Sequence, residues 1–349
     1  MYIIIAILIF GVLIATHELG HFTAAKLCGV RVNEFSIGMG PALLKKQKGE
    51  TLYALRAFPV GGYCAMEGED EETDDPRAFS AQSPLKRIVI LIAGSLSNFL
   101  IGLLVILILS VGIKGVAGTT VVELVDGFKY AEGGIAVGDT VLSIDGHGVY
   151  YAGDFTTYMS RTDGRADVLV RRDGEKVLLK DYALQPEHYE ENGVTTYRYG
   201  LTFNVVPATV GVKLHYSFYS AFNYVRLVWM SLSDLVAGRV GVKDLSGVVG
   251  IVDTINDVGE SAPTKSAAAS SIASLAAFIA VNLAVMNMLP IPALDGGRVF
   301  LLLVTLVIEK LIGRRVDPKY EGYIHAAGLV LLLALMGYVM FNDIAKIIS

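Results

Sequence analysis

The chain has 349 residues, of which 53% are hydrophobic and only 18% are charged. A soluble protein typically has about a quarter charged residues, and here the deficit comes from several long apolar runs, so the composition indicates an integral membrane protein. The net charge of −5 argues against nucleic-acid binding, which requires a basic surface.

The first apolar run, roughly Tyr2 to Leu27, is long enough to cross about 30 Å of hydrocarbon as a helix. Because it lacks a positively charged start, we expect a retained membrane helix rather than a cleaved signal peptide. Within this run, His17, Glu18 and His21 form the pattern H-E-x-x-H. Ionisable groups at membrane depth are costly, so they require a partner, a metal or a chemical task.

On a helix, His17 and His21 lie one turn apart, and both imidazoles can reach one metal ion. Glu18 is close enough to take a proton from a water on that ion without binding the ion itself. Two imidazoles and one carboxylate suit zinc and leave a fourth position for water. The alternative is a chance match of five residues, but the cost of uncompensated charge in a membrane span favours a metal site.

The loop after the first run is predicted to contain a β-hairpin. The stretch "VNEFSIGMGPALLKKQKGETLYALRAFPVGGYCAM" has extended apolar pieces separated by Gly and Pro, and such a hairpin could offer an edge strand. The acidic run after Met66, "EGEDEETDD", is interpreted as a solvated loop without an assigned function. Cys28 and Cys64 both fall in this loop, which we expect to be cytoplasmic, so no structural disulfide is expected.

Three further runs are long enough to span the bilayer: Ile88 to Ile113, Ala267 to Leu289, and Ile324 to Phe341. Only helices satisfy their own backbone in lipid, so each is predicted to be a helix. Lys and Arg concentrate in the first loop and in the loop before the last helix, which places both loops in the cytoplasm. The N-terminus, the middle region and the C-terminus then lie outside.

The middle region, about Gly115 to Pro207, reads as a small soluble domain of strands with a short helix. Its strongest local signal is Asp173-Gly174, a typical hairpin turn inside "ADVLVRRDGEKVLLKDY". The following segment "SFYSAFNYVRLVWMSLSDLV" carries Arg226 and Asp234 and is rich in aromatic residues. These features favour an amphipathic helix at the membrane interface over a fifth span, although a span stays possible.

The third apolar run is interrupted by "PIPALDGGR" and resumes as "VFLLLVTLVI". Pro290 and Pro292 cannot continue a helix, and the interruption contains one acid, Asp295. Non-helical backbone at this depth is tolerated only where it is buried or lines a wet cavity, so a break with an acid indicates a site. The alternative is a surface loop in which Asp295 caps the next helix.

Three asparagines lie in the predicted membrane helices, namely Asn98, Asn282 and Asn287. Their side chains could bind a substrate carbonyl or support a developing oxyanion. They could equally hold helices together, which is the common role of Asn in membranes.

At this point the motifs resemble the site-2 protease family of zinc intramembrane metalloproteases. The resemblance rests on "HELGH" in the first helix, "GGYCAMEGED" after the strand-like loop and "NMLPIPALDGG" on a later helix, and it covers most of the chain. The region containing "GIAVGDTVLSIDG" resembles a PDZ domain, and "LSGVVGIV" recurs in the PDZ-bearing bacterial branch, the RseP/RasP type. The implied fold is an α-helical polytopic membrane protein with about four transmembrane helices, a membrane-associated β-hairpin loop and an inserted α+β PDZ domain.

The resemblance implies His17, His21 and Asp295 as the ligands of Zn2+, and Glu18 as the general base. It assigns Asn98 to a motif usually written G-P-x-x-N, although Ser95 stands here in place of the proline. Similarly, Val248 replaces a proline that is common in the "LSGVVGI" motif.

The segment "FPVGGY", which includes Gly61, Gly62 and Tyr63, corresponds in this family to a β-loop thought to receive the unfolded substrate strand.

The runs and motifs together predict four parts: a membrane core over 1–113 with the hairpin loop, a PDZ domain over 114–207, an amphipathic surface region over 208–262, and a second membrane core over 263–349.

The implied function is regulated intramembrane proteolysis in the inner (plasma) membrane, by a multi-pass enzyme in contact with the lipid bilayer and with its PDZ domain extracytoplasmic. The expected substrates are single-span membrane proteins, such as anti-sigma factors or signal-peptide remnants, after a prior extracytoplasmic cleavage. The PDZ domain would act as a size filter, a tail reader or a plain spacer.

Two alternatives are a non-enzymatic membrane adaptor with a structural metal, and a metal transporter. Transport explains neither a glutamate beside the first histidine nor a PDZ domain.

Overall fold

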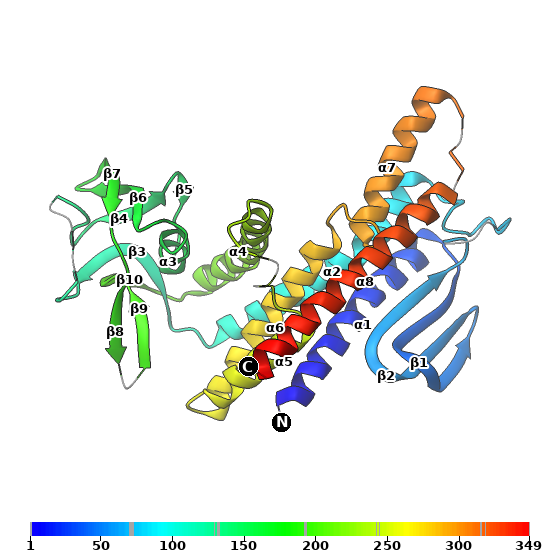
Figure 1. The fold of residues 1–349 in the computed structure, drawn as a ribbon, viewed down its shortest axis with the longest axis horizontal. Helices are drawn as coiled ribbons and strands as arrows, with labels where there is room; N and C mark the ends of the chain where they lie inside the picture. Colours follow the sequence, from blue (N-terminus) through cyan, green and yellow to red (C-terminus); the bar gives the residue numbers. More distant parts are fainter. Residues whose placement is uncertain are drawn as a thin grey trace. The chain divides into compact units, whose positions relative to one another are not determined.

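The computed structural model describes residues 2–69, 73–128, 130, 133–191, 194–241, 243, 245–314, 316–317 and 319–348. The chain divides into two compact units (Figure 1). The first comprises Met1–Ser110 and Ser217–Ser349, and the second comprises Val111–Tyr216. The four-part division predicted from the sequence stays a prediction.

Helices dominate the first unit. They are α1 (Tyr2–Cys28), α2 (Pro84–Val111), α4 (Val210–Val236), α5 (Val248–Glu260), α6 (Lys265–Asn287), α7 (Asp295–Ile312) and α8 (Lys319–Ile348). The start of α4, up to Tyr216, belongs to the second unit. Among the described residues, four helices are long and apolar enough to cross a membrane, namely α1, α2, α6 and α8. These are the four runs predicted from the sequence, so the chain has the helices of a multi-pass membrane protein.

Small residues let these helices approach closely. A Cβ added to Gly20 of α1 would lie 2.3 Å from the carbonyl oxygen of Ala93 in α2. A Cβ on Gly102 of α2 would lie 3.0 Å from the carbonyl oxygen of Ala277 in α6. Glycine at such crossings is typical of membrane helices, which associate through close van der Waals packing.

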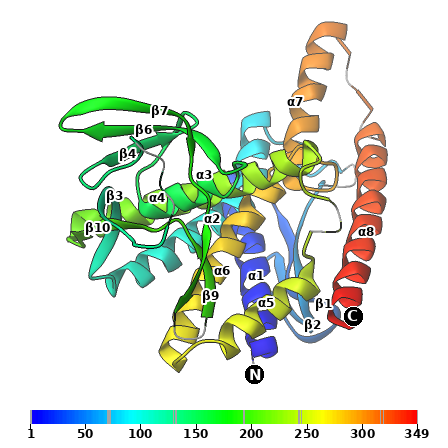
Figure 2. The ribbon, with the colours of Figure 1, turned by 60° about the vertical axis from the view of Figure 1, so that its left-hand side comes forward.

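Helix α5 packs on α1 and α6 near the N-terminus of the chain (Figure 2). Its first turn is capped from a distant part of the sequence, because the buried Asp343 of α8 accepts hydrogen bonds from the N–H groups of Gly247 and Gly250, both at 2.9 Å. Val248 is the first residue of α5, a position where proline and other residues are equally tolerated. Helix α2 likewise continues unbroken through Ser95.

The loop after α1 forms the predicted hairpin, with β1 (Val32–Lys48) antiparallel to β2 (Thr51–Met66). The hairpin curls back on itself. Residues 34–37 of β1 pair with residues 62–65 of β2 on one side and with residues 52–55 of β2 on the other. Residues 62–66 therefore pair with β1 on one side only and form an edge of this sheet among the described residues. The same strand, β2, packs against α1.

Helix α4 has two different faces from Ser217 onward. On one face, Ala221 and Val228 are buried against α2 and α6. On another, the aromatic side chains of Phe218, Phe222 and Trp229 are exposed. The sequence prediction of an amphipathic helix here agrees with this arrangement, and α4 is not among the candidate spans.

The second unit is a β-rich domain. Its elements are β3 (Gly115–Leu124), β4 (Thr140–Ile144), β5 (His147–Gly148), α3 (Ala152–Met159), β6 (Arg165–Arg172), β7 (Glu175–Ala183), β8 (Glu187–Glu191), β9 (Val194–Arg198) and β10 (Leu201–Pro207). The main sheet has the order β10-β3-β4-β6-β7, with β5 paired to β4. The turn between β6 and β7 is the one predicted, since Asp173 and Gly174 have φ angles of 52° and 89°.

Candidate metal centre

Helix α1 carries the two histidines of the HELGH motif on one side. The Nε2 atoms of His17 and His21 are 3.1 Å apart, and the two rings meet edge to face. Asp295 is the first residue of α7 and lies far away in the sequence. Its Oδ2 atom is 3.1 Å from His17 Nε2 and 3.3 Å from His21 Nε2. The structure thus brings together the three residues predicted as ligands.

The three atoms are arranged as a zinc ion requires. For bonds of about 2.0–2.1 Å, the edges of a ligand tetrahedron are about 3.3 Å, close to the distances between these atoms. Asp295 Oδ2 is buried and has no hydrogen-bond partner of good geometry among the described residues, despite the two nearby nitrogens. A buried carboxylate oxygen without a hydrogen bond is costly, and a bound cation would remove that cost. The donor set therefore fits zinc.

The surroundings of His21 fix which ring nitrogen faces the centre. Its Nδ1 atom lies 2.8 Å from the carbonyl oxygen of Ile90 in α2, so Nδ1–H donates and Nε2 stays free to bind a metal. On His17, Nδ1 lies 3.5 Å from the side-chain amide of Asn287. Space beside both rings is provided by Gly94 of α2, where a Cβ would lie 2.3 Å from His21 Nε2.

The break between α6 and α7 turns the chain so that Asp295 reaches α1. Ala293 has a φ of 76°, a left-handed conformation that is strained for a residue with a Cβ. Gly296 and Gly297 pack directly on the turn, because added Cβ atoms would lie 2.3 Å from the carbonyl oxygen of Met288 and 2.1 Å from that of Ile291. Any larger residue there would push α7 away from the turn.

The side chain of Glu18 extends from α1 to the edge of the hairpin sheet. A Cβ on Gly62 would be 3.3 Å from Glu18 Cγ, and the N–H of Cys64 donates a hydrogen bond to the Glu18 carboxylate. Burial, followed by the charge of Glu18, raises the pKa of the Cys64 thiol above its usual range. The thiol next to the centre therefore stays protonated.

The remaining predicted site residues differ in their contacts. Asn98 is buried in α2, and its Oδ1 atom has no hydrogen-bond partner among the described residues. The described hydrogen bonds include one from Asn287 to His17 but none from Asn282. Gly61 has a φ of 87° and packs on Met39, while the Tyr63 hydroxyl accepts a hydrogen bond from Arg56.

Sequence reasoning missed several contacts that hold this region. Arg298, one turn after Asp295, forms an ion pair with Glu69 in the acidic run. Glu67 of the same run accepts a hydrogen bond of 2.7 Å from Asn33. The expectation of a solvated acidic loop is therefore wrong for Glu69, which is mostly buried against Arg298, while Glu67 keeps contact with solvent. Residues 70–72 of the run lie outside the described part.

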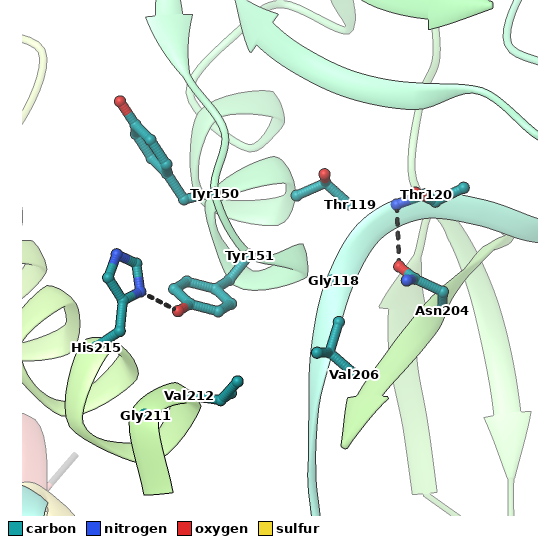
Figure 3. A pocket seen from close by; sticks show the side chains of 10 residues that line it. All are labelled: Gly118, Thr119, Thr120, Tyr150, Tyr151, Asn204, Val206, Gly211, Val212 and His215. Carbon is teal, nitrogen blue, oxygen red and sulfur yellow. Dashed lines mark hydrogen bonds between the residues drawn. The ribbon is translucent and has the colours of Figure 1, made fainter. Parts of the chain in front are cut away.

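The second unit has its own cavity of about 410 Å³ (Figure 3). In it the Tyr151 hydroxyl lies 2.7 Å from His215 Nδ1, and the N–H of Thr120 donates to Asn204. None of its lining residues belongs to the metal cluster. Among the described residues, His17, His21 and Asp295 form the one group of three potential metal ligands.

Comparison with known proteins finds relatives that match nearly the whole chain. The family model described as Peptidase family M50 matches residues 5–335. A protein of Clostridium perfringens named "Putative zinc metalloprotease" is 36% identical over 99% of this chain and 98% of its own length. A protein of the same name from Fusobacterium nucleatum is 30% identical over the whole of both chains. The regulator of sigma-W protease RasP of Bacillus subtilis is 27% identical over 99% of this chain and 98% of its own.

The family match extends over nearly the whole chain, from within α1 to within α8, and therefore includes both halves of the metal cluster. The chain belongs to peptidase family M50, the site-2 protease family that its motifs resemble, and is a metalloprotease.

Proposed function

We propose that this protein is a zinc-dependent endopeptidase that cleaves transmembrane segments of membrane-anchored proteins. The observation that carries the proposal is the convergence of His17 Nε2, His21 Nε2 and Asp295 Oδ2 within 3.1–3.3 Å of one another, beside Glu18, in a unit built from apolar helices. The names of the C. perfringens and F. nucleatum relatives support zinc as the metal.

His17, His21 and Asp295 would hold the zinc, which when bound acts as a Lewis acid that lowers the pKa of a coordinated water and polarises a peptide carbonyl. Glu18 takes the proton from the attacking water and passes it to the leaving amine as the peptide bond breaks. Asn287 and Asn98 are our candidates for hydrogen bonds to the oxyanion of the transition state. The Ile90 carbonyl keeps His21 in the tautomer that this arrangement needs.

The hairpin provides a way to present the substrate. A transmembrane helix has to unwind before its scissile carbonyl becomes accessible, and in lipid its freed backbone groups need new partners. Residues 62–66 form a sheet edge beside Glu18, so an unwound substrate segment could add to this edge as a further strand. Gly61, Gly62 and Tyr63 would then contact the substrate backbone.

The B. subtilis relative is named "Regulator of sigma-W protease RasP", and this name supports regulated intramembrane proteolysis for this chain. We accordingly infer single-span substrates that have already been shortened outside the membrane. We also infer an inner-membrane location and a PDZ-type second unit on the extracytoplasmic side, as a size filter or a tail reader. In support, a groove of about 200 Å³ lies beside Phe155 of α3 and Phe203 of the edge strand β10.

The test is cleavage of a single-span fusion protein by the purified full chain in detergent or liposomes. Glu18→Gln should retain zinc and abolish cleavage, while the control Glu175→Gln, an exposed position on β7 of the second unit, should cleave at the wild-type rate. Unchanged cleavage by Glu18→Gln would overturn the proposal. Full biological activity of that variant in cells would favour the adaptor function, and zinc flux into liposomes would favour transport.

A further inference from the structure

The strained turn before Asp295 is held from the side by α8. The backbone N–H of Ala293 donates a hydrogen bond of 3.1 Å to His325 Nδ1. One turn later on α8, Gly328 packs on the same turn, since an added Cβ would lie 2.4 Å from Pro292 Cβ and 2.7 Å from the Pro292 carbonyl oxygen. Two residues of one helix face therefore contact the two residues that precede Leu294 and Asp295.

We propose that His325 is a positioning residue for the Asp295 carboxylate, acting through the Ala293 N–H. The proposal rests on the metal site proposed above. It is distinct from the ligand set because His325 does not belong to the metal cluster.

The hydrogen bond explains how a left-handed alanine persists at this position. Such a conformation is sparsely populated and persists only where the surrounding structure holds it. The side chain of His325 is mostly buried, and its Nδ1 accepts the N–H that would otherwise be left without a partner. With Nδ1 as acceptor, the proton of the neutral ring sits on Nε2, which faces Glu321 Oε1 at 3.8 Å.

The turn has little freedom once these contacts form. Gly296 and Gly297 pack against its carbonyl groups from the α7 side, and Gly328 closes on it from α8. A small rotation at Ala293 would move Asp295 relative to His17 and His21, whose separation from Oδ2 is 3.1–3.3 Å. Outer partners of this kind typically change metal affinity by about 10- to 100-fold when removed.

The experiment measures zinc affinity by competition with a chromophoric chelator, using the full chain in detergent. His325→Leu removes the acceptor and should weaken zinc binding by about 10- to 100-fold. His325→Asn places an amide oxygen near the position of Nδ1 and should restore most of the affinity. His325→Gln, of similar polarity, places its amide near the position of Nε2 and should not. Tyr323→Leu, at an exposed position of α8, serves as the matched control and should bind zinc as the wild type does.

Asp295→Asn distinguishes a failure of the proposed metal site from a failure of the role of His325. If Asp295→Asn binds zinc as tightly as the wild type, the proposed metal site is wrong. If Asp295→Asn weakens zinc binding but His325→Leu and His325→Gln do not, the role of His325 is overturned and the metal site stands. Equal loss in His325→Asn and His325→Gln would also overturn it, because the acceptor at Nδ1 would not be the cause. Melting of the metal-free variants identifies any general loss of folding, and the Asn–Gln comparison remains decisive if His325→Leu does not fold.

Discussion

Gly94 of α2 occupies the space next to both histidine rings, so Gly94→Ala is a direct perturbation of the metal centre. The new Cβ would lie 2.3 Å from His21 Nε2 and 2.8 Å from His17 Cε1. Ordinary contacts begin at 3.4 Å, so the His21 ring has to retreat by about 1.1 Å, or α2 has to move by the same amount. Either movement spoils the 3.1–3.3 Å spacing of the three ligand atoms.

The expected cost follows from the overlap. Overpacking a filled interior typically costs about 1–3 kcal/mol, and each ~1.4 kcal/mol is a factor of ten, so zinc affinity should fall by about 5- to 140-fold. Proteolysis of a single-span fusion should fall at least as much, because a displacement of about 1 Å at a catalytic site can cost about 100-fold in rate.

The assay is chelator competition on the purified full chain, followed by the cleavage assay at saturating zinc. Gly337→Ala in α8 is the matched control, because a Cβ there meets nothing within 4 Å and the change in helix propensity is the same. Wild-type zinc affinity and wild-type cleavage in Gly94→Ala would refute the inference that α2 closes on the histidines.

Three further predictions concern other parts of the molecule. Burial alone would raise the pKa of Asp139. Hydrogen bonds from Arg172 and from the Ala136 N–H, together with the charge of Arg172, outweigh burial and hold this pKa below its usual value. The resulting stability is present above the unfolded pKa of about 3.9 and is lost as the pH falls through the folded value. Asp139→Asn should therefore destabilise the second unit by about 1–3 kcal/mol near neutral pH, seen as faster hydrogen exchange in β4 and β6, and wild-type exchange rates would contradict this. At pH 8, Cys64 should react with iodoacetamide at least about ten times more slowly than the partly exposed Cys28, because burial and then the charge of Glu18 raise the pKa of the Cys64 thiol. Peptide mass spectrometry measures both rates, and faster labelling of Cys64 would contradict this. Asp343→Ala should lower the stability of the first unit by about 1–2 kcal/mol, since it removes the acceptor for two N–H groups at the start of α5, and an unchanged melting temperature in detergent would argue against this cap.

Much of the fold could be predicted because its signals are local. Apolar runs of sufficient length define the four candidate spans, and Asp173-Gly174 defines a hairpin turn whose φ angles are both positive. The HELGH motif is also local, because His17 and His21 lie one turn apart on a single helix. Asp295 could be proposed from the prolines before it and from the family resemblance, although its distance from the histidines required a structure.

The contacts that sequence could not predict join elements far apart in the chain. In the sequence, Gly94 is an ordinary small residue of a membrane helix. Only the packing of α2 against α1 brings it to the rings of His17 and His21. His325 reads as one polar residue near the start of the last helix, and only packing brings it to Ala293, 32 positions earlier. The pairing of Glu69 with Arg298 joins positions 229 apart, so no local pattern distinguishes Glu69 from the other acids of its run.

Packing leaves both helices intact at the two positions where family prolines are replaced. Helix α2 is continuous through Ser95, so the replacement leaves the helix near Asn98 intact. Val248 opens α5, where the backbone N–H needs no partner within the helix and a proline would fit as well. Each replacement leaves its helix in place, and Asn98 stays buried in α2.

The most direct measurement of the central claim is zinc K-edge X-ray absorption on the zinc-loaded Glu18→Gln protein, which lacks the proposed general base. The account predicts two imidazole nitrogens at about 2.0–2.1 Å and one carboxylate oxygen at about 2.0–2.2 Å, with the oxygen contribution altered in an added Asp295→Asn variant. A sulfur ligand at about 2.3 Å, or a spectrum that does not change with Asp295→Asn, would contradict the ligand set of His17, His21 and Asp295.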